Sequence, residues 1–197
     1  MDKQYDQAYF QQWYRRGDIG GPARLARKVA LAVACAEYWL ERPVHTVLDI
    51  GCGEGAWRAP LLKLRPKVQY LGFDSSEYAV RRHGARRNLH LAGFGDFQWL
   101  RPCAPVDLLV CADVLHYVPD AELKRGLPGL AELCGGVAFL ETFTAQDDFE
   151  GDHVDFKART AAWYRRQLDR VGMRPAGSHC WLGPDLAPQA AALETTA

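Results

Sequence analysis

The stretch HTVLDIGCGEG, residues 45–55, places an apolar run directly before three glycines. The apolar run is typical of a buried strand, but Asp49 puts a carboxyl group two residues before the first glycine. Glycines permit backbone conformations and close ligand approach that side chains would block. This stretch therefore predicts a strand, a tight turn and a ligand that contacts backbone beside a negative charge.

Length and composition limit the class of protein. The 197 residues, 48% of them hydrophobic, suffice for one globular core, so we expect residues 1–197 to form a single domain. Lys plus Arg and Asp plus Glu each number 24, which gives no overall charge to attract nucleic acid or an anionic membrane. Six cysteines without a Cys-x-x-Cys pair indicate free thiols in a reducing compartment. No apolar run approaches membrane-span length, so we expect a cytoplasmic protein.

Strand and helix patterns alternate along the chain. Strands are expected within residues 45–52, 67–74, 89–96, 106–113, 137–144 and 174–182. Helices are expected within residues 22–42, 54–65, 76–87, 120–136 and 156–173, with a kink or break at Pro128. Strands separated by helices predict a parallel sheet with right-handed crossovers and helices on both faces.

The glycine turn fits two kinds of ligand. Residues 51–56, GCGEGA, match the dinucleotide pattern G-x-G-x-x-G/A, but Asp49 and Glu54 flank it with carboxylates where a pyrophosphate would add two negative charges. A ligand that carries a sulfonium and an ammonium on a ribose and an adenine would use the same glycines and be attracted by those acids. S-adenosylmethionine is such a ligand.

VLDIGCGEG, residues 47–55, closely resembles the first motif of class I S-adenosylmethionine-dependent methyltransferases, and the resemblance extends over residues 44–145. It implies a Rossmann-like three-layer α/β/α sandwich, mostly parallel, with an antiparallel strand late in the chain. It also implies methyl transfer to an O, N or C nucleophile of a small molecule, with S-adenosylhomocysteine as product. Residues 1–43 would then be a lid and first helix, 44–145 the cofactor core, and 146–197 the substrate loop, last helix and C-terminal strand.

The resemblance also implies a cofactor site at the carboxyl ends of four strands. Asp74 takes the position of the ribose-binding acid, GDF (residues 95–97) that of the adenine site, and CADVLHYV (residues 111–118) that of the segment beneath the methionyl part. Each aspartate alone could be a helix cap, whereas four at strand ends favour a site. The expected cofactor residues are Asp49, Gly51, Cys52, Gly53, Asp74, Ser75, Asp96, Phe97, Asp113 and Val114.

Methyl transfer from a sulfonium mainly requires alignment of the reacting atoms and exclusion of water. Where a base is needed, His116 is the leading candidate, because it follows the fourth strand and histidine titrates near neutrality. The alternative is that its ring only packs against the loop or hydrogen-bonds to it. Glu141, at the end of the fifth strand, is a second candidate.

Two segments are expected to form the substrate pocket. Residues 5–16 are dense in aromatic side chains and could close over the site as a lid, or dock a helix on the core. Residues 143–156 carry five acids, three phenylalanines and His153, which suits an amine-bearing small molecule; the acids match no familiar metal-ligand spacing, so we expect no metal. The expected substrate residues are Tyr9, Trp13, Tyr14, Tyr117 and Glu141.

Two other functions stay open at this point. An NAD(P)-dependent oxidoreductase would share the sheet, the glycines and Asp74, although no Tyr-x-x-x-Lys pair or other hydride-transfer signature occurs. A non-catalytic protein that binds S-adenosylmethionine would share the whole cofactor motif. Only one strand is convincing after Gly172, where the family has an antiparallel hairpin, and a homodimer is one way to cover such an edge.

Overall fold

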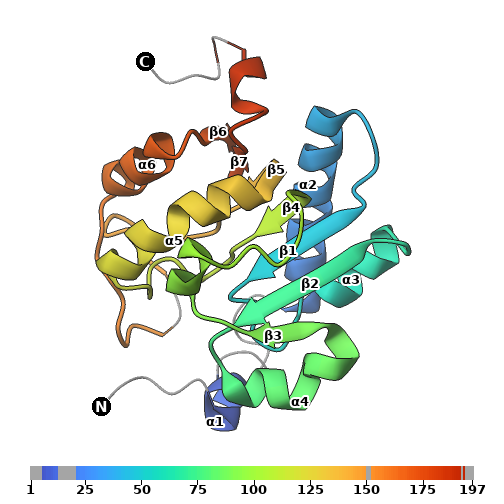
Figure 1. The fold of residues 1–197 in the computed structure, drawn as a ribbon. Helices are drawn as coiled ribbons and strands as arrows, with labels where there is room; N and C mark the ends of the chain where they lie inside the picture. Colours follow the sequence, from blue (N-terminus) through green and yellow to red (C-terminus); the bar gives the residue numbers. More distant parts are fainter. Residues whose placement is uncertain (1–5, 13–20, 150–151, 192, 194–197) are drawn as a thin grey trace.

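The computed structural model describes residues 6–12, 21–149, 152–191 and 193, and forms one α/β unit (Figure 1). The helices are α1 (Gln7–Phe10), α2 (Pro22–Leu40), α3 (Arg58–Leu64), α4 (Glu77–Arg87), α5 (Asp120–Leu133) and α6 (Ala161–Arg170), with 3-10 helices η2 (Phe94–Gln98) and η3 (Ala187–Gln189). The strands are β1 (Thr46–Ile50), β2 (Gln69–Asp74), β3 (Leu89–Leu91), β4 (Val106–Val110), β5 (Cys134–Phe139), β6 (Arg174–Gly177) and β7 (Cys180–Leu182). No helix among the described residues combines the length and apolar character needed to cross a membrane.

One seven-stranded sheet has the order β3-β2-β1-β4-β5-β7-β6. The strands from β1 to β5 pair in parallel, whereas β7 pairs antiparallel with both β5 and β6. From β1 the strand order runs to one side through β2 and β3, and from β4 it runs to the other side, so the topological switch point lies between β1 and β4. Open α/β sheets bind ligands at such a switch point, outside the carboxyl ends of the strands. The predicted mostly parallel sheet with an antiparallel late strand is confirmed.

Alternating side chains of the strands supply two apolar cores. Leu48 and Leu109 face α5, α6 and η2, while Val47 and Leu108 face α2 and α3. Figure 1 shows these two sets of helices on opposite sides of the sheet. Because strand side chains alternate between faces, Asp49 points to the same side as Val47, toward α2 and α3.

Helix α5 is continuous through Pro128, so the predicted break is not observed. Its two glycines pack on the backbone of η2: a Cβ at Gly126 would lie 2.3 Å from the Phe94 carbonyl oxygen, and one at Gly129 would lie 1.8 Å from that of Phe97. These close approaches hold α5 against η2, and packing of this kind can retain a helix that one proline weakens.

The C-terminal part of the sheet differs from the single strand predicted from the sequence. Residues 174–182, expected as one strand, form the antiparallel hairpin β6–β7, with Ser178 and His179 both at positive φ in the turn. Two-residue hairpin turns with positive φ at both positions usually carry Asn-Gly or Asp-Gly. Ser-His lacks that signal, which is why the turn could not be recognised from the sequence.

Candidate functional site

The glycine turn after β1 depends on backbone conformations that glycine adopts readily. Gly51, Gly53 and Gly55 have φ values of +73°, +54° and +77°. The amides of Gly51 and Cys52 both donate to the carbonyl oxygen of Phe73 in β2, at 2.7 and 3.0 Å. The turn is thereby fixed against the end of the neighbouring strand.

Two other segments approach this turn too closely for larger residues. A Cβ on Gly51 would lie 2.3 Å from Cγ2 of Val114, and a Cβ on Gly53 would lie 3.1 Å from the Phe10 ring. The loop after β4 and the N-terminal helix α1 therefore both meet at the glycines. Phe10 also stacks on Tyr78 of α4, with ring centroids 5.9 Å apart.

Asp74, at the end of β2, ties the glycine turn to the start of α4. Its Oδ2 accepts from the Gly53 amide at 2.7 Å, and its Oδ1 accepts from the Ser76 amide at 2.8 Å. Burial raises the pKa of Asp74 above its usual range, while these two hydrogen bonds oppose the rise. A carboxylate oxygen has two acceptor sites, so each oxygen retains capacity for a ligand hydroxyl.

A cleft of about 500 Å³ opens along the carboxyl edge of the sheet. Its size suits a nucleoside-sized ligand with a small partner. The lining comes from α1, from the strand ends, and from the loops after β3, β4 and β5. The residues are Tyr9, Phe10, Ile50, Gly51, Gly53, Asp74, Ser75, Ala92, Gly93, Phe94, Asp113, Val114, Tyr117, Val118, Pro119, Glu122, Asp155 and Lys157.

A family model described as a methyltransferase domain matches residues 20–186. The chain belongs to the class I S-adenosylmethionine-dependent methyltransferases. The predicted family and the cofactor that defines it are confirmed, and the comparisons give no support to a dehydrogenase or a non-catalytic protein.

Two curated relatives and one solved structure are similar to this methyltransferase. The trans-aconitate 2-methyltransferases of Azoarcus sp. (strain BH72) and Deinococcus radiodurans are 31% and 32% identical to it over 156 and 154 residues. These matches cover 76% of the chain but only 58% and 56% of the relatives, so the chain spans little more than half their length. The sugar N-methyltransferase KedS8 from Streptoalloteichus sp. ATCC 53650 shares the fold, with a TM-score of 0.67, 16% identity, and coverage of 93% of this chain and 94% of that one.

Several predicted cofactor residues of the methyltransferase meet at the cleft. Gly51, Gly53, Asp74, Ser75, Asp113 and Val114 all line it. Ser75 is exposed there, and Ser76 caps α4 by accepting from the Ala79 amide. The carboxyl ends of β1, β2 and β4 thus bring these predicted residues together.

Asp49 and Cys52 lie beneath the glycine turn rather than on the cleft wall. The Asp49 carboxyl is buried and accepts a 2.7 Å hydrogen bond from the Tyr70 hydroxyl. Burial raises the pKa of Asp49 to about 7; the Tyr70 hydrogen bond opposes this rise and the charge of Asp74 adds to it. The Cys52 thiol is also buried, which raises its pKa. The strand alternation that turns Asp49 toward α2 accounts for its position.

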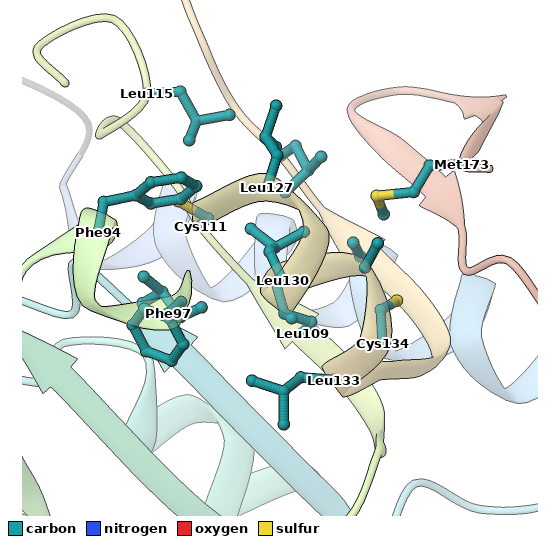
Figure 2. Packing of buried hydrophobic residues seen from close by; sticks show 14 of the residues in the cluster. Phe94, Phe97, Leu109, Cys111, Leu115, Leu127, Leu130, Leu133, Cys134 and Met173 are labelled. Carbon is teal, nitrogen blue, oxygen red and sulfur yellow. The ribbon is translucent and has the colours of Figure 1, made fainter. Parts of the chain in front are cut away.

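The predicted adenine segment is placed differently from the prediction. Phe97 is fully buried and packs with the leucines of α5, as Figure 2 shows, so it cannot contact a ligand in the cleft. Asp96 is exposed and accepts from the Gly93 amide at 2.8 Å, and it is absent from the cleft wall. Ala92, Gly93 and Phe94 line the cleft instead, whereas Phe97, one 3-10 turn later on the same face of η2, is more deeply buried under α5.

His116 is also displaced from the expected position. Its ring is fully buried, with Tyr117, Phe143, Phe149 and Phe156 at centroid distances of 4.2 to 6.0 Å. Nδ1 accepts from the Phe143 amide at 3.3 Å, and Nε2 lies 3.3 Å from Oδ1 of Asp113. The ring does not reach the cleft surface, which favours the alternative that it packs against the loop and hydrogen-bonds to it.

The expected substrate residues divide into three groups. Tyr9 and Tyr117 line the cleft, and the Tyr117 hydroxyl donates to the Asp152 carbonyl oxygen at 2.7 Å. Glu141 is buried against α2, where its Oε2 lies 2.5 Å from Nζ of Lys28. Trp13 and Tyr14 lie outside the described residues.

Several other cleft residues were not singled out from the sequence, although Asp155 lies within residues 143–156, which were expected to form the substrate pocket. Lys157 and Asp155 reach the cleft from the loop after β5 because the Lys157 amide donates to the His116 carbonyl oxygen at 2.8 Å. Glu122 reaches it from the first turn of α5. Among the described residues, no group of three or more His, Cys, Asp or Glu side chains could hold a metal ion.

Proposed function

We propose that this methyltransferase methylates a small molecule whose accepting end is neutral or cationic. The observation that carries the proposal is the charge of the cleft wall. Its described residues include four carboxylates, from Asp74, Asp113, Glu122 and Asp155, and one cation, Lys157. A wall of one sign raises the local concentration of ligands of the opposite sign and disfavours those of the same sign.

The cofactor fits the same wall. Asp74 would accept from the ribose hydroxyls, the glycine turn would allow close approach, and Gly93 and Phe94 would border the adenine. When bound, S-adenosylmethionine supplies an activated methyl group. The residues of this chain then bind and orient the two reactants, and α1 with the loops after β4 and β5 exclude water from them.

With Asp74 assigned to ribose and Asp113 to the cofactor, Glu122, Asp155 and Lys157 remain for the acceptor. Two carboxylates and one ammonium carry a formal net charge of −1. An acceptor with several carboxylates would be repelled, whereas an amine-bearing acceptor would be attracted. The charge of these three side chains therefore favours an acceptor that bears an amine over one that bears several carboxylates.

A carboxylic acid acceptor is the second candidate. Lys157 could pair with one carboxylate, and the curated relatives are named for trans-aconitate. Because the chain spans little more than half of those relatives, their substrate does not transfer directly to it.

A methyl-release assay separates the two candidates. S-adenosylhomocysteine formation would be measured with a panel of small amines and with trans-aconitate, using wild type and Lys157→Met. We expect turnover with amines, little with trans-aconitate, and no loss of amine turnover in the variant. Turnover of trans-aconitate that Lys157→Met abolishes would contradict the proposal and support the acid acceptor.

A further inference from the structure

The environment of His116 restricts what its ring can do. The Phe143 amide points at Nδ1, so a proton on Nδ1 would face the hydrogen of that amide. The geometry therefore fixes the tautomer with its proton on Nε2 and occupies the lone pair of Nδ1. A ring in this state has no acceptor left for a substrate proton, which argues against His116 as a general base.

The remaining nitrogen faces Asp113. His116 Nε2 is buried and has no well-aligned hydrogen-bond partner among the described residues, while Oδ1 of Asp113 lies 3.3 Å away. A buried N–H that lacks an aligned partner is costly, and a small rotation toward this carboxylate would satisfy it. The two residues are thus a pair, with His116 fully buried and the Asp113 side chain 38% exposed at the cleft.

The backbone of Asp113 supports a constrained position for this carboxylate. Asp113 has φ +64°, a conformation that costs a residue with a side chain energy and persists only where its surroundings enforce it. Its amide donates to the Glu141 carbonyl oxygen at 2.8 Å, and the next residue, Val114, packs directly on Gly51. The loop therefore holds the Asp113 carboxylate beside the glycine turn.

We infer that His116 is a positioning residue that holds the Asp113 carboxylate at the cleft, and that Asp113 contacts the ammonium group of the bound cofactor. The inference rests on the proposed function for its ligand. It changes the role expected for His116 from proton transfer to support of an anionic group. A carboxylate in this place attracts an ammonium and also fits the acidic character of the cleft.

Two substitutions of His116 separate its two contacts. His116→Asn can retain an acceptor near Nδ1 for the Phe143 amide but removes the Nε2 donor, whereas His116→Gln can retain a donor near Nε2 and removes the other contact. S-adenosylhomocysteine, which carries the ammonium, would be titrated into each variant by calorimetry. We expect Asp113→Asn to weaken binding about tenfold, His116→Asn to weaken it several-fold, and His116→Gln to stay within about twofold of wild type.

The coupling between the residues decides the inference. In the double variant Asp113→Asn/His116→Asn, binding should be no weaker than in Asp113→Asn alone, because His116 acts through the carboxylate. Additive losses, or wild-type affinity in Asp113→Asn, would overturn it. His45 is exposed and directly precedes β1, at the amino end of the sheet. The control variant His45→Asn should therefore bind S-adenosylhomocysteine as wild type does.

A measurement on the wild-type protein covers the case in which a variant fails to fold. The ¹⁵N shifts of the His116 ring should show a proton on Nε2 and none on Nδ1, and a protonated Nδ1 would overturn the inference. The two proposals also fail separately: no turnover of the amine panel would remove the proposed function and leave the His116–Asp113 pairing standing, whereas absent binding of S-adenosylhomocysteine to wild type would overturn the Asp113–ammonium contact.

Discussion

The two ends of the sheet treat buried aspartates in opposite ways. At the amino end, Asp107 of β4 pairs with Arg42 at 2.6 Å and accepts from the amides of His45 and Thr46 at 2.7 and 3.1 Å. Burial alone would raise the pKa of Asp107, but Arg42 and the two amides outweigh it and lower the pKa below its usual range. At the carboxyl end, Asp49 accepts from the neutral phenol of Tyr70, and burial raises its pKa to about 7.

The opposite pKa shifts of Asp107 and Asp49 indicate different roles for the two ends of the sheet. A carboxylate whose charge is compensated within the chain stabilises the fold and has little attraction left for a ligand. A carboxyl group held by a neutral donor has no cation of the chain beside it, so burial disfavours its charged form until a cation arrives to pair with it. Asp107 therefore contributes to the stability of the sheet, whereas Asp74 and Asp113 line the cleft proposed for the cofactor and Asp49 lies beneath it.

The largest effect is expected from Asp74→Ala, which tests the carboxyl end of the sheet. The substitution removes the expected ribose acceptor and the clamp on the Gly53 and Ser76 amides. Hydrogen bonds to a charged acceptor contribute about 1.5–3 kcal/mol each, so S-adenosylhomocysteine affinity should fall about a hundredfold or more. Calorimetric titration at one salt concentration measures the loss.

Asp107→Ala is the matched control for that variant. It leaves the His45 and Thr46 amides without their acceptor and should lower the free energy of unfolding by about 1–3 kcal/mol. Affinity for S-adenosylhomocysteine should stay at the wild-type value. The contrast between the two ends fails if Asp107→Ala weakens binding as much as Asp74→Ala does.

A smaller effect is expected from Gly51→Ala, which tests the close approach of the loop to the turn. The alanine would keep a backbone φ of +73°, and its Cβ would lie 2.3 Å from Cγ2 of Val114. We therefore expect a loss of about 2–3 kcal/mol in unfolding free energy. Denaturant titration measures it.

Two further variants interpret the Gly51→Ala result. Gly177→Ala, also at positive φ but with open space around its Cβ, should cost only about 1 kcal/mol. Adding Val114→Ala to Gly51→Ala should recover part of the stability. No recovery would mean that backbone strain, and not contact with Val114, limits this position.

The last test concerns the pH dependence of stability. Since the pKa of Asp49 is about 7 in the folded chain and 3.8 as its ordinary value, the folded state binds more protons between these values. The contribution of Asp49 to stability is therefore present at low pH and is lost as pH rises through about 7. Asp49→Asn removes this loss.

We expect the stability of Asp49→Asn relative to wild type to be higher at about pH 8 than at about pH 4.5, by about 1–3 kcal/mol. Chemical unfolding of both proteins at the two pH values measures the difference, and groups that titrate alike in both proteins cancel. A difference that does not change with pH would show that Asp49 is ionised throughout.

The parts of the site that follow from strand ends could be predicted from the sequence. Gly51, Asp74 and Asp113 stand at the carboxyl ends of predictable strands, and these ends meet at one edge in any parallel sheet of this order. Phe97 and His116 could not be placed, because their burial depends on the packing of η2 against α5 and on contacts with Phe143, Phe149 and Phe156. Lys157 was missed because the hydrogen bond of its amide to the His116 carbonyl oxygen, which holds it near the cleft, joins residues far apart in the sequence.

The sequence by itself determined the class of fold and the kind of ligand. Apolar period and glycine positions are local properties, and they are enough to specify strands, turns and the acids beside them. Tertiary structure alone decided which acid faces the cleft: Asp49 turns inward, Asp74 clamps the turn, and Asp113 is partly exposed beside a buried histidine. The physical reason is that side-chain direction and charge compensation depend on packing partners that lie far apart in the chain.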